Sequence, residues 1–181
     1  MEDIESYLKQ FDPFRDENEE VTEESHDYVK RMQAGPLPNW PDEPLIEWLH
    51  RHAQCIDRYA KLKYERFQFQ RQHWLLDQIP RCEAFDKKYF YDNFRDIKLR
   101  AENPKDWLAH FMLENGTWNT PIVLLDNENN RYGLKIGETL KQPYHLLEGH
   151  GRLSFLNGLR NLECAKPGHD VWLVNLTKDD Q

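Results

Sequence analysis

The segment Pro143-Tyr144-His145-Leu146-Leu147-Glu148-Gly149-His150-Gly151-Arg152-Leu153 combines a short apolar run, two glycines and a dense group of polar side chains. The run Tyr144–Leu147 predicts a strand, and residues 152–162, with apolar positions at 153, 156 and 159, predict a helix. Glycines at a strand-to-helix turn let the backbone bend sharply and expose amide groups at the helix N-terminus. An acid, an imidazole and a guanidinium fall within residues 148–152, so the candidate site is placed there.

The composition of the 181-residue chain predicts one ordinary domain, or one domain with a sizeable extension. Hydrophobic residues make up 39% of the chain and include six tryptophans, which is enough to build a core. No apolar run approaches the roughly 20 residues that cross a membrane, and the acidic N-terminus is unlike a signal peptide. We therefore expect a cytoplasmic protein that does not bind membranes.

The net charge of −8 lies entirely in residues 1–30, which hold 11 acidic and 3 basic residues. The rest of the chain is neutral, which argues against the basic face that non-specific duplex binding needs. Cys55, Cys82 and Cys164 form no C-x-x-C pair, so they predict buried free thiols and neither a disulfide framework nor a zinc site.

Apolar residues at three- and four-residue steps predict a helix near residues 4–11 and a longer one over 45–62. A helix near residues 23–33 is expected from Thr22 or Ser25 as its cap and from Gly35 and the following prolines as its end. His52 and Cys55 fall on the apolar face of the longer helix, which indicates core positions. The basic and aromatic segment 64–74 fits a strand or a helix. Its side chains could pack in the core or stack on single-stranded nucleic acid; these are Arg66, Phe67, Phe69, Arg71 and Trp74.

The second half has shorter elements. A strand is expected from Trp74 to about Pro80 and a helix over 87–97, and Asn103-Pro104 is typical of a helix start, with Gly116 at its end. The buried face of the helix that begins at Asn103-Pro104 is expected to consist of Trp107, Leu108, Phe111 and Met112. Strands are predicted over 121–125 and 171–174. The fold class is therefore α+β, a helical N-terminal half followed by elements in roughly β-α-β-β-α-β order.

Three segments after residue 79 resemble the ParB/sulfiredoxin superfamily, the ParB-like nuclease domain. Residues 107–116 are similar to the helix before its first sequence box, Thr120–Leu125 resembles that box, and Tyr144–Leu153 resembles the second box. The resemblance implies a small mixed-sheet domain over residues 79–181. It divides the chain into an acidic helical segment 1–35, a helical region 36–78 and this domain.

The resemblance implies binding of a nucleotide or nucleic-acid phosphate at the second box, in some members with phosphoryl transfer or hydrolysis. The family glycine corresponds to Gly149, its middle position to His150 and its last arginine to Arg152. Gly151 stands where the family commonly has the first of two arginines, so one phosphate ligand is lost.

The residues themselves suggest the same chemistry. The amides of 149–152 and the guanidinium of Arg152 could bind phosphate, with His150 as an acid, base or ligand. Glu148 could accept a proton or hold Mg²⁺ together with a nucleotide. Asp86, Asp126 and Glu128 are either further candidate acids or solvated loop residues. Alternatively, the glycines only form a turn and Arg152 pairs with Glu148. The chain would then be a non-catalytic acidic module of the immunity or antitoxin type that masks a basic protein.

Overall fold

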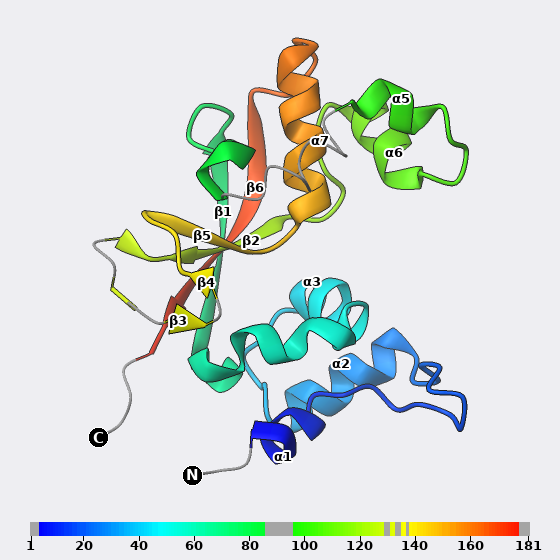
Figure 1. Ribbon diagram of the computed structural model, residues 1–181, viewed down its shortest axis with the longest axis vertical. Coiled ribbons are helices and arrows are strands. Elements are labelled where there is room, and N and C mark those ends of the chain that lie inside the picture. The colour runs from blue at the N-terminus through cyan, green and yellow to red at the C-terminus, as the bar shows by residue number, and fades with distance from the viewer. Residues whose placement is uncertain (1–3, 86–95, 129–130, 133–134, 137, 178–181) are drawn as a thin grey trace. The chain divides into compact units, whose positions relative to one another are not determined.

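The computed structural model describes residues 4–85, 96–128, 131–132, 135–136 and 138–177 (Figure 1). Its helical and strand segments are, in chain order, α1 (Ile4–Lys9), α2 (Ser25–Ala34), α3 (Asp42–Pro44), η1 (Leu45–His50), η2 (Ala53–Leu62), η3 (Tyr64–Arg66), β1 (Phe67–Leu75), η4 (Cys82–Phe85), α5 (Ile97–Ala101), α6 (Trp107–Asn115), β2 (Ile122–Asp126), β3 (Lys135–Ile136), β4 (Glu138–Thr139), β5 (Tyr144–Glu148), α7 (His150–Asn161) and β6 (Gly168–Leu176). The α+β class expected from the sequence is confirmed.

Two compact units divide the chain. The first consists of Met1–Phe69, Leu134–Thr139 and Val174–Gln181, and the second of Gln70–Gly133 and Leu140–Leu173. The expected division at residues 35 and 78 stays a prediction. The strands β1 and β6 each cross from one unit to the other.

Aromatic side chains form the core of the first unit. The ring of Trp40 stacks on Phe67 with centroids 5.5 Å apart, and its indole N–H donates to the carbonyl of Tyr64 at 2.9 Å. Tyr28 donates to the carbonyl of Phe11 at 2.7 Å, which ties α2 to the segment after α1. Burial raises the pKa of the Tyr28 hydroxyl, so it remains a donor at all ordinary pH values. The acidic N-terminal segment is therefore an integral part of this core.

The prediction of one continuous α-helix over residues 45–62 is wrong. The segment is helical in two parts, a π-helical η1 and a 3₁₀-helical η2, and His52 between them leaves helical geometry at φ −116° and ψ 39°. In η2 four of the five buried residues follow the three-residue period of a 3₁₀-helix, at Ala53, Ile56, Tyr59 and Leu62, and the fifth is Ala60. Cys55 falls off that row and is exposed, contrary to expectation.

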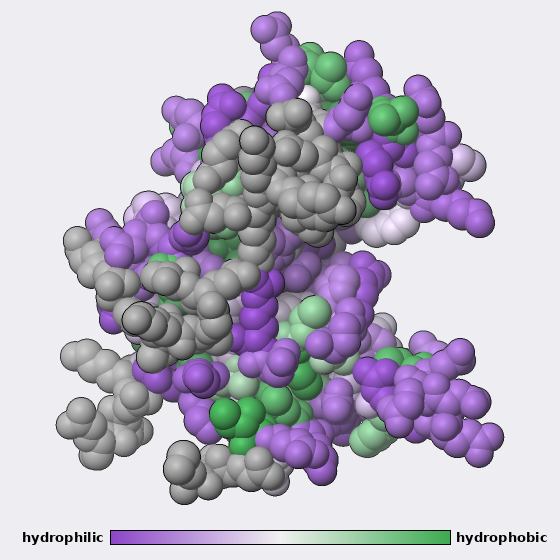
Figure 2. Space-filling model, in the orientation of Figure 1, coloured by the Kyte–Doolittle hydropathy of each residue, from purple (hydrophilic) through white to green (hydrophobic). Residues whose placement is uncertain are grey.

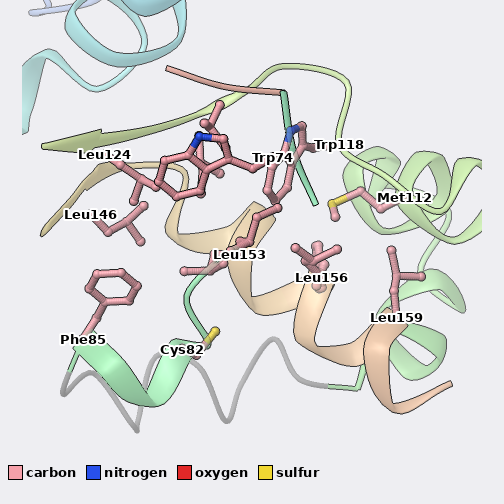
Figure 3. Close-up of a cluster of buried hydrophobic side chains, with 14 of the residues drawn as sticks. Trp74, Cys82, Phe85, Met112, Trp118, Leu124, Leu146, Leu153, Leu156 and Leu159 are labelled. Carbon is pink, nitrogen blue, oxygen red and sulfur yellow. The ribbon is translucent and has the colours of Figure 1, made fainter. Parts of the chain in front are cut away.

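The second unit packs α7 against the sheet, whose strand order is β1-β6-β2-β5. β2 and β5 are antiparallel, with Leu124 opposite Leu146. The predicted inward residues of α7 are confirmed: Leu153, Leu156 and Leu159 are fully buried beside the side chains of α6, β1, β2 and β5 (Figure 3). Burying each such leucine stabilises the fold by about 1.5–3 kcal/mol.

Two other expectations for this unit need correction. The helix α6 begins at Trp107, with Asp106 as its cap, because the Asp106 carboxylate accepts from the amide of Ala109. Asn103 instead accepts from the amide of Lys105 in the preceding turn. The Trp107 side chain is 52% exposed, although it was expected in the core. Gly116 ends the helix in the left-handed conformation, as its position predicted.

Among the cysteines, Cys82 is buried and Cys164 is exposed, so the expectation of buried thiols holds for one residue of three. The helix expected over 87–97 lies largely outside the described residues, as does Asp86; Ile97 is the first residue of α5. Within the described part of the chain, no helix combines the length and apolar character needed to span a membrane. Hydrophilic residues predominate on the face shown in Figure 2.

Candidate functional site

The turn between β5 and α7 has the geometry that its glycine predicted. Gly149 has φ 99°, a left-handed conformation that residues with a Cβ rarely adopt, and its carbonyl accepts the first helical bond of α7 from Leu153 at 2.9 Å. A Cβ on Gly149 would lie 2.5 Å from Cγ2 of Ile122 on the neighbouring strand. Both the backbone and the packing therefore require glycine at position 149.

Gly151 differs from Gly149 in both respects. It lies in the first turn of α7 without a positive φ, and a Cβ there would have its nearest neighbour, Cδ2 of Leu108, at an ordinary contact distance of 3.9 Å. Glycine in a helix costs about 0.5–1 kcal/mol relative to alanine. Neither the conformation nor the packing of this chain accounts for that cost.

Arg152 and Glu148 form an ion pair one turn apart. Nη2 of Arg152 lies 3.6 Å from Oε1 of Glu148, and the arginine is only 7% exposed. This contact corresponds to the pairing that the sequence left open as an alternative to phosphate binding. A buried pair is costly to break from one side, because the remaining charge would stay buried. Any anion that reaches Arg152 must therefore compete with Glu148 for the guanidinium.

His150 is the first residue of α7 and is half-buried. Its position beside the amides of the helix N-terminus is the one from which an imidazole could contact a bound anion. The five predicted residues thus form one turn, in which Gly149 sets the backbone, Glu148 and Arg152 pair, and His150 and Gly151 lie at the helix start.

The further candidate acids do not join this turn. β2 runs antiparallel to β5, with Val123 opposite Glu148 and Asp126 opposite Tyr144, so Asp126 lies at the other end of the strand pair. Asp126 forms an ion pair with Arg131 at 3.6 Å. Glu128 follows two residues after Asp126, and its amide donates to the Asp126 carboxylate. In the described residues, no three His, Cys, Asp or Glu side chains gather as a metal site.

The segment expected to be strand or helix consists of the 3₁₀ turn η3 and the strand β1. Phe67 is fully buried and Trp74 nearly so, which places these two rings in the core, whereas Phe69 is half-buried and Arg71 is exposed. Arg66 donates to the carbonyl of Thr177 through Nε and Nη2. For Phe67 and Trp74 the alternative of core packing is therefore confirmed, and stacking on single-stranded nucleic acid stays a prediction for the other side chains.

A second cluster, which we call the Asp170 cluster, joins β1 and β6 and was missed in the sequence. Asp170 accepts from Nε and Nη2 of Arg71 at 3.1 and 2.9 Å, and its other oxygen lies 2.8 Å from Nδ1 of His73. These contacts, first the one with His73, lower the pKa of Asp170. A Cβ on Gly168 would lie 2.3 Å from Nε2 of His73, so the imidazole packs directly on that glycine. The sequence shows polar residues at alternate positions of both strands, but this pattern does not show that the two strands are neighbours.

Comparisons with known proteins add no assignment. No protein-family model matches the chain, and neither a curated protein nor a solved structure shows a significant match. The resemblance to the ParB/sulfiredoxin superfamily therefore rests on the segments quoted above.

Proposed function

We propose that the second half of the chain is a ParB-like domain that binds the phosphate of a nucleotide or nucleic acid at the turn Glu148–Arg152. The observation that carries this proposal is Gly151. A glycine at this position lowers helix stability, although neither the backbone conformation nor the packing requires one. Close approach of a ligand to the helix N-terminus accounts for a residue without a side chain at this position.

The order of elements supports the same proposal. From β1 onward the sheet strands and the helices follow one another as β1, the helices α5 and α6, β2, β5, α7 and β6, with the ribbon β3–β4 inserted before β5. Among the described residues, this order is compatible with the β-α-β-β-α-β order expected from the sequence. The first strand begins at Phe67, earlier than the expected boundary at residue 79.

Phosphate would bind to the amides at the start of α7, with the helix dipole favouring its charge. Arg152 would contribute once the anion displaced Glu148 from the guanidinium, because phosphate offers Arg the same bidentate geometry as a carboxylate. Glu148, released in this exchange, could accept a proton in transfer or hydrolysis of the phosphate, and His150 could supply one. Mg²⁺ is commonly held by one or two carboxylates together with substrate phosphates, and Glu148 is the carboxylate that this turn offers.

The test is calorimetric titration of the full chain with ATP, ADP and CTP, with and without Mg²⁺. Gly151→Ala should weaken binding by about tenfold, or about 1.4 kcal/mol, because the added methyl group occupies the space of the ligand. Asn161→Ala, at the exposed opposite end of α7, is the matched control and should bind as the unmodified chain does.

Binding too weak to detect at about 1 mM of each nucleotide would refute nucleotide binding at this turn. Equal affinity of the Gly151→Ala and Asn161→Ala variants would place the ligand elsewhere. Hydrolysis is tested separately, by phosphate release from the same nucleotides. Loss of release in Glu148→Gln with binding retained would support the catalytic role of Glu148.

A second candidate function is a non-catalytic acidic module that masks a basic protein. The observation that favours it is a loop in the first unit, closed by an isolated bridge between Arg15 and Val21. Phe14 and Val21 are exposed there, at 60% and 41%, and four of the five residues between Arg15 and Val21 are acidic. An apolar group surrounded by carboxylates suits a basic partner with an apolar pocket.

This candidate is tested by point substitution, because deletion of residues 1–30 would remove the core residues Tyr7, Phe11 and Tyr28. The charge reversals Glu17→Lys, Glu19→Lys and Glu20→Lys together should abolish affinity capture of a basic protein. The control variant carries Glu114→Lys, a charge reversal in α6 and therefore outside the acidic loop. If the captured proteins are the same for both variants, the loop is not the binding surface.

A further inference from the structure

The strand β1 is an edge of the sheet. The strand order β1-β6-β2-β5 gives it one hydrogen-bonded neighbour, β6, among the strands of the described residues (Figure 1). β1 is nine residues long, whereas β5 at the opposite edge has five. In such a strand, alternate backbone N–H and C=O groups point away from the neighbour and can pair with another chain.

The sequence of β1, Phe-Gln-Phe-Gln-Arg-Gln-His-Trp-Leu, lacks the features that usually protect an edge. It contains no proline and no lysine, and Arg71 is its one residue with a permanent charge. That charge is directed across the sheet, since the Arg71 guanidinium donates twice to Asp170 of β6. The edge therefore presents little net charge to oppose a second strand.

The polar side chains of β1 are also complementary to themselves. Gln68, Gln70 and Gln72 alternate along one face of the strand, the first two exposed and the third half-buried. Each amide group has donors and an acceptor, so glutamines on two identical strands can bond to one another. Gln72 already accepts from the indole of Trp74 at 2.7 Å and uses its own amide N–H on Gln70 at 3.4 Å.

We propose that two copies of this chain pair through antiparallel β1 strands, in the register centred on Gln70, to form a sheet continuous across a homodimer. In this register Gln70 faces Gln70 and Gln68 faces Gln72 of the other copy, while Arg71 faces the ring of Phe69. Centring one residue later would place Arg71 opposite Arg71, and like charges directly opposite are destabilising. The two-fold symmetry of such an interface is the commonest one among homo-oligomers.

Cross-linking tests both the edge and the register. In a background with the exposed thiols replaced (Cys55→Ser and Cys164→Ser), Gln70→Cys should form a disulfide dimer under mild oxidation. Directly opposed residues have Cα atoms about 4.5–5.5 Å apart, within disulfide range. Gln72→Cys is the matched control and should form no disulfide dimer under the same mild oxidation, since the Cα atoms of the two residues would be about 13 Å apart in this register.

Sedimentation of the full chain between about 1 and 100 µM gives the second readout. The unmodified chain should show a concentration-dependent dimer, and Gln70→Lys should raise its dissociation constant by about tenfold or more, because the two added charges would meet. Gln54→Lys, on the exposed side of η2, should leave the dimer unchanged. Circular dichroism confirms that each variant is folded.

A chain that remains monomeric across this range overturns the proposal, as does a dimer that Gln70→Lys does not weaken. Equal cross-linking of the Gln70→Cys and Gln72→Cys variants overturns the register. If Gln70→Lys fails to fold, the comparison of the two cysteine variants decides. Phosphate binding plays no part in these measurements, so the two proposals can fail independently.

Discussion

Gly149 and Gly151 are two residues apart, but they have different physical reasons to be glycine. Gly149 is required by its left-handed backbone and by Ile122, which a Cβ would contact at 2.5 Å. Gly151 has ordinary space around it and is helical. Gly149 therefore has a structural role in this turn, and Gly151 is a candidate for a functional one.

Alanine substitutions should show this difference in stability. Gly149→Ala should lower the free energy of unfolding by about 2–4 kcal/mol, from the left-handed conformation together with overpacking. Gly151→Ala should leave it unchanged or raise it by up to about 1 kcal/mol, because alanine favours helix. Urea unfolding measures both variants. Equal destabilisation would mean that Gly151 also has a structural role.

His169 on β6 predicts a pH dependence of stability. The imidazole is only 1% exposed, its Nδ1 lies 2.7 Å from Oγ1 of Thr117, and burial lowers its pKa from 6.5 to about 4. Between these values the unfolded chain binds a proton that the folded chain does not. The contribution of His169 is therefore complete above pH 6.5 and is lost as the pH falls toward 4, by about 1–3 kcal/mol.

Urea unfolding of the unmodified chain and of His169→Gln between pH 7.5 and about 4 checks this expectation. The difference in unfolding free energy between the two proteins should shrink as the pH falls. His26→Gln, on the exposed side of α2, should behave as the unmodified chain does at every pH. A constant difference between the chain and His169→Gln would contradict the lowered pKa.

Helix boundaries depend on which side chain reaches a free amide. The sequence favours Asn103-Pro104 as the start of a helix, but Asp106 caps α6 through Ala109 and also accepts from Nε of Arg100 at 2.7 Å. Both residues are good caps by type. The contact with Arg100 of α5 favours Asp106, and this contact could not be seen in the local pattern.

Removing the two candidate caps should therefore have unequal effects. Asp106→Ala should cost about 1–2 kcal/mol of unfolding free energy, since it removes the cap of α6. Asn103→Ala should cost less, because it removes only a turn contact with Lys105. Thermal unfolding of the two variants provides the comparison. A larger loss in Asn103→Ala would indicate that the helix begins where the sequence suggested.

The two compact units are assembled from non-adjacent parts of the chain, because Leu134–Thr139 and Val174–Gln181 group with the first 69 residues. The acidic N-terminal segment contributes Tyr7 and Phe11 to the core of the first unit. Tyr7 donates to Glu65 and accepts from the amide of Tyr64, both at 2.7 Å. Negative charge and core packing therefore occur in the same segment.

Substitution of two phenylalanines should show which part of this acidic segment contributes to the core. Phe11→Ala should destabilise the protein by about 3–5 kcal/mol, because the ring is fully buried. Phe14→Ala should change stability by less than about 1 kcal/mol, since the residue is exposed and the guanidinium carbon of Arg31 lies over its ring, 4.5 Å from the centroid. Chemical unfolding followed by tryptophan fluorescence measures both. Similar losses in the two variants would contradict the placement of Phe11.

Local patterns were sufficient for much of the second unit. The strand at 144–148, the glycine turn and the buried leucines of α7 follow from side-chain periodicity and from the backbone freedom of glycine, both of which act over a few residues. The same reasoning failed for η2, whose 3₁₀ period moved Cys55 to the surface. The break at His52 changes which face of the helix each later residue occupies. The apolar pattern alone does not show that the helix breaks there.

Sequence periodicity predicted the α+β class and the strand and helix on either side of the turn at 148–152, and the residue types in that turn made it the candidate anion site. The tertiary structure added the contacts that these side chains and more distant ones make in the folded chain. It paired Arg152 with Glu148 below the surface, placed Ile122 against Gly149, and joined Asp170 to Arg71 and His73. The last two contacts depend on which strands are neighbours and in what register, and pairings between distant segments are set by the packing of the whole sheet.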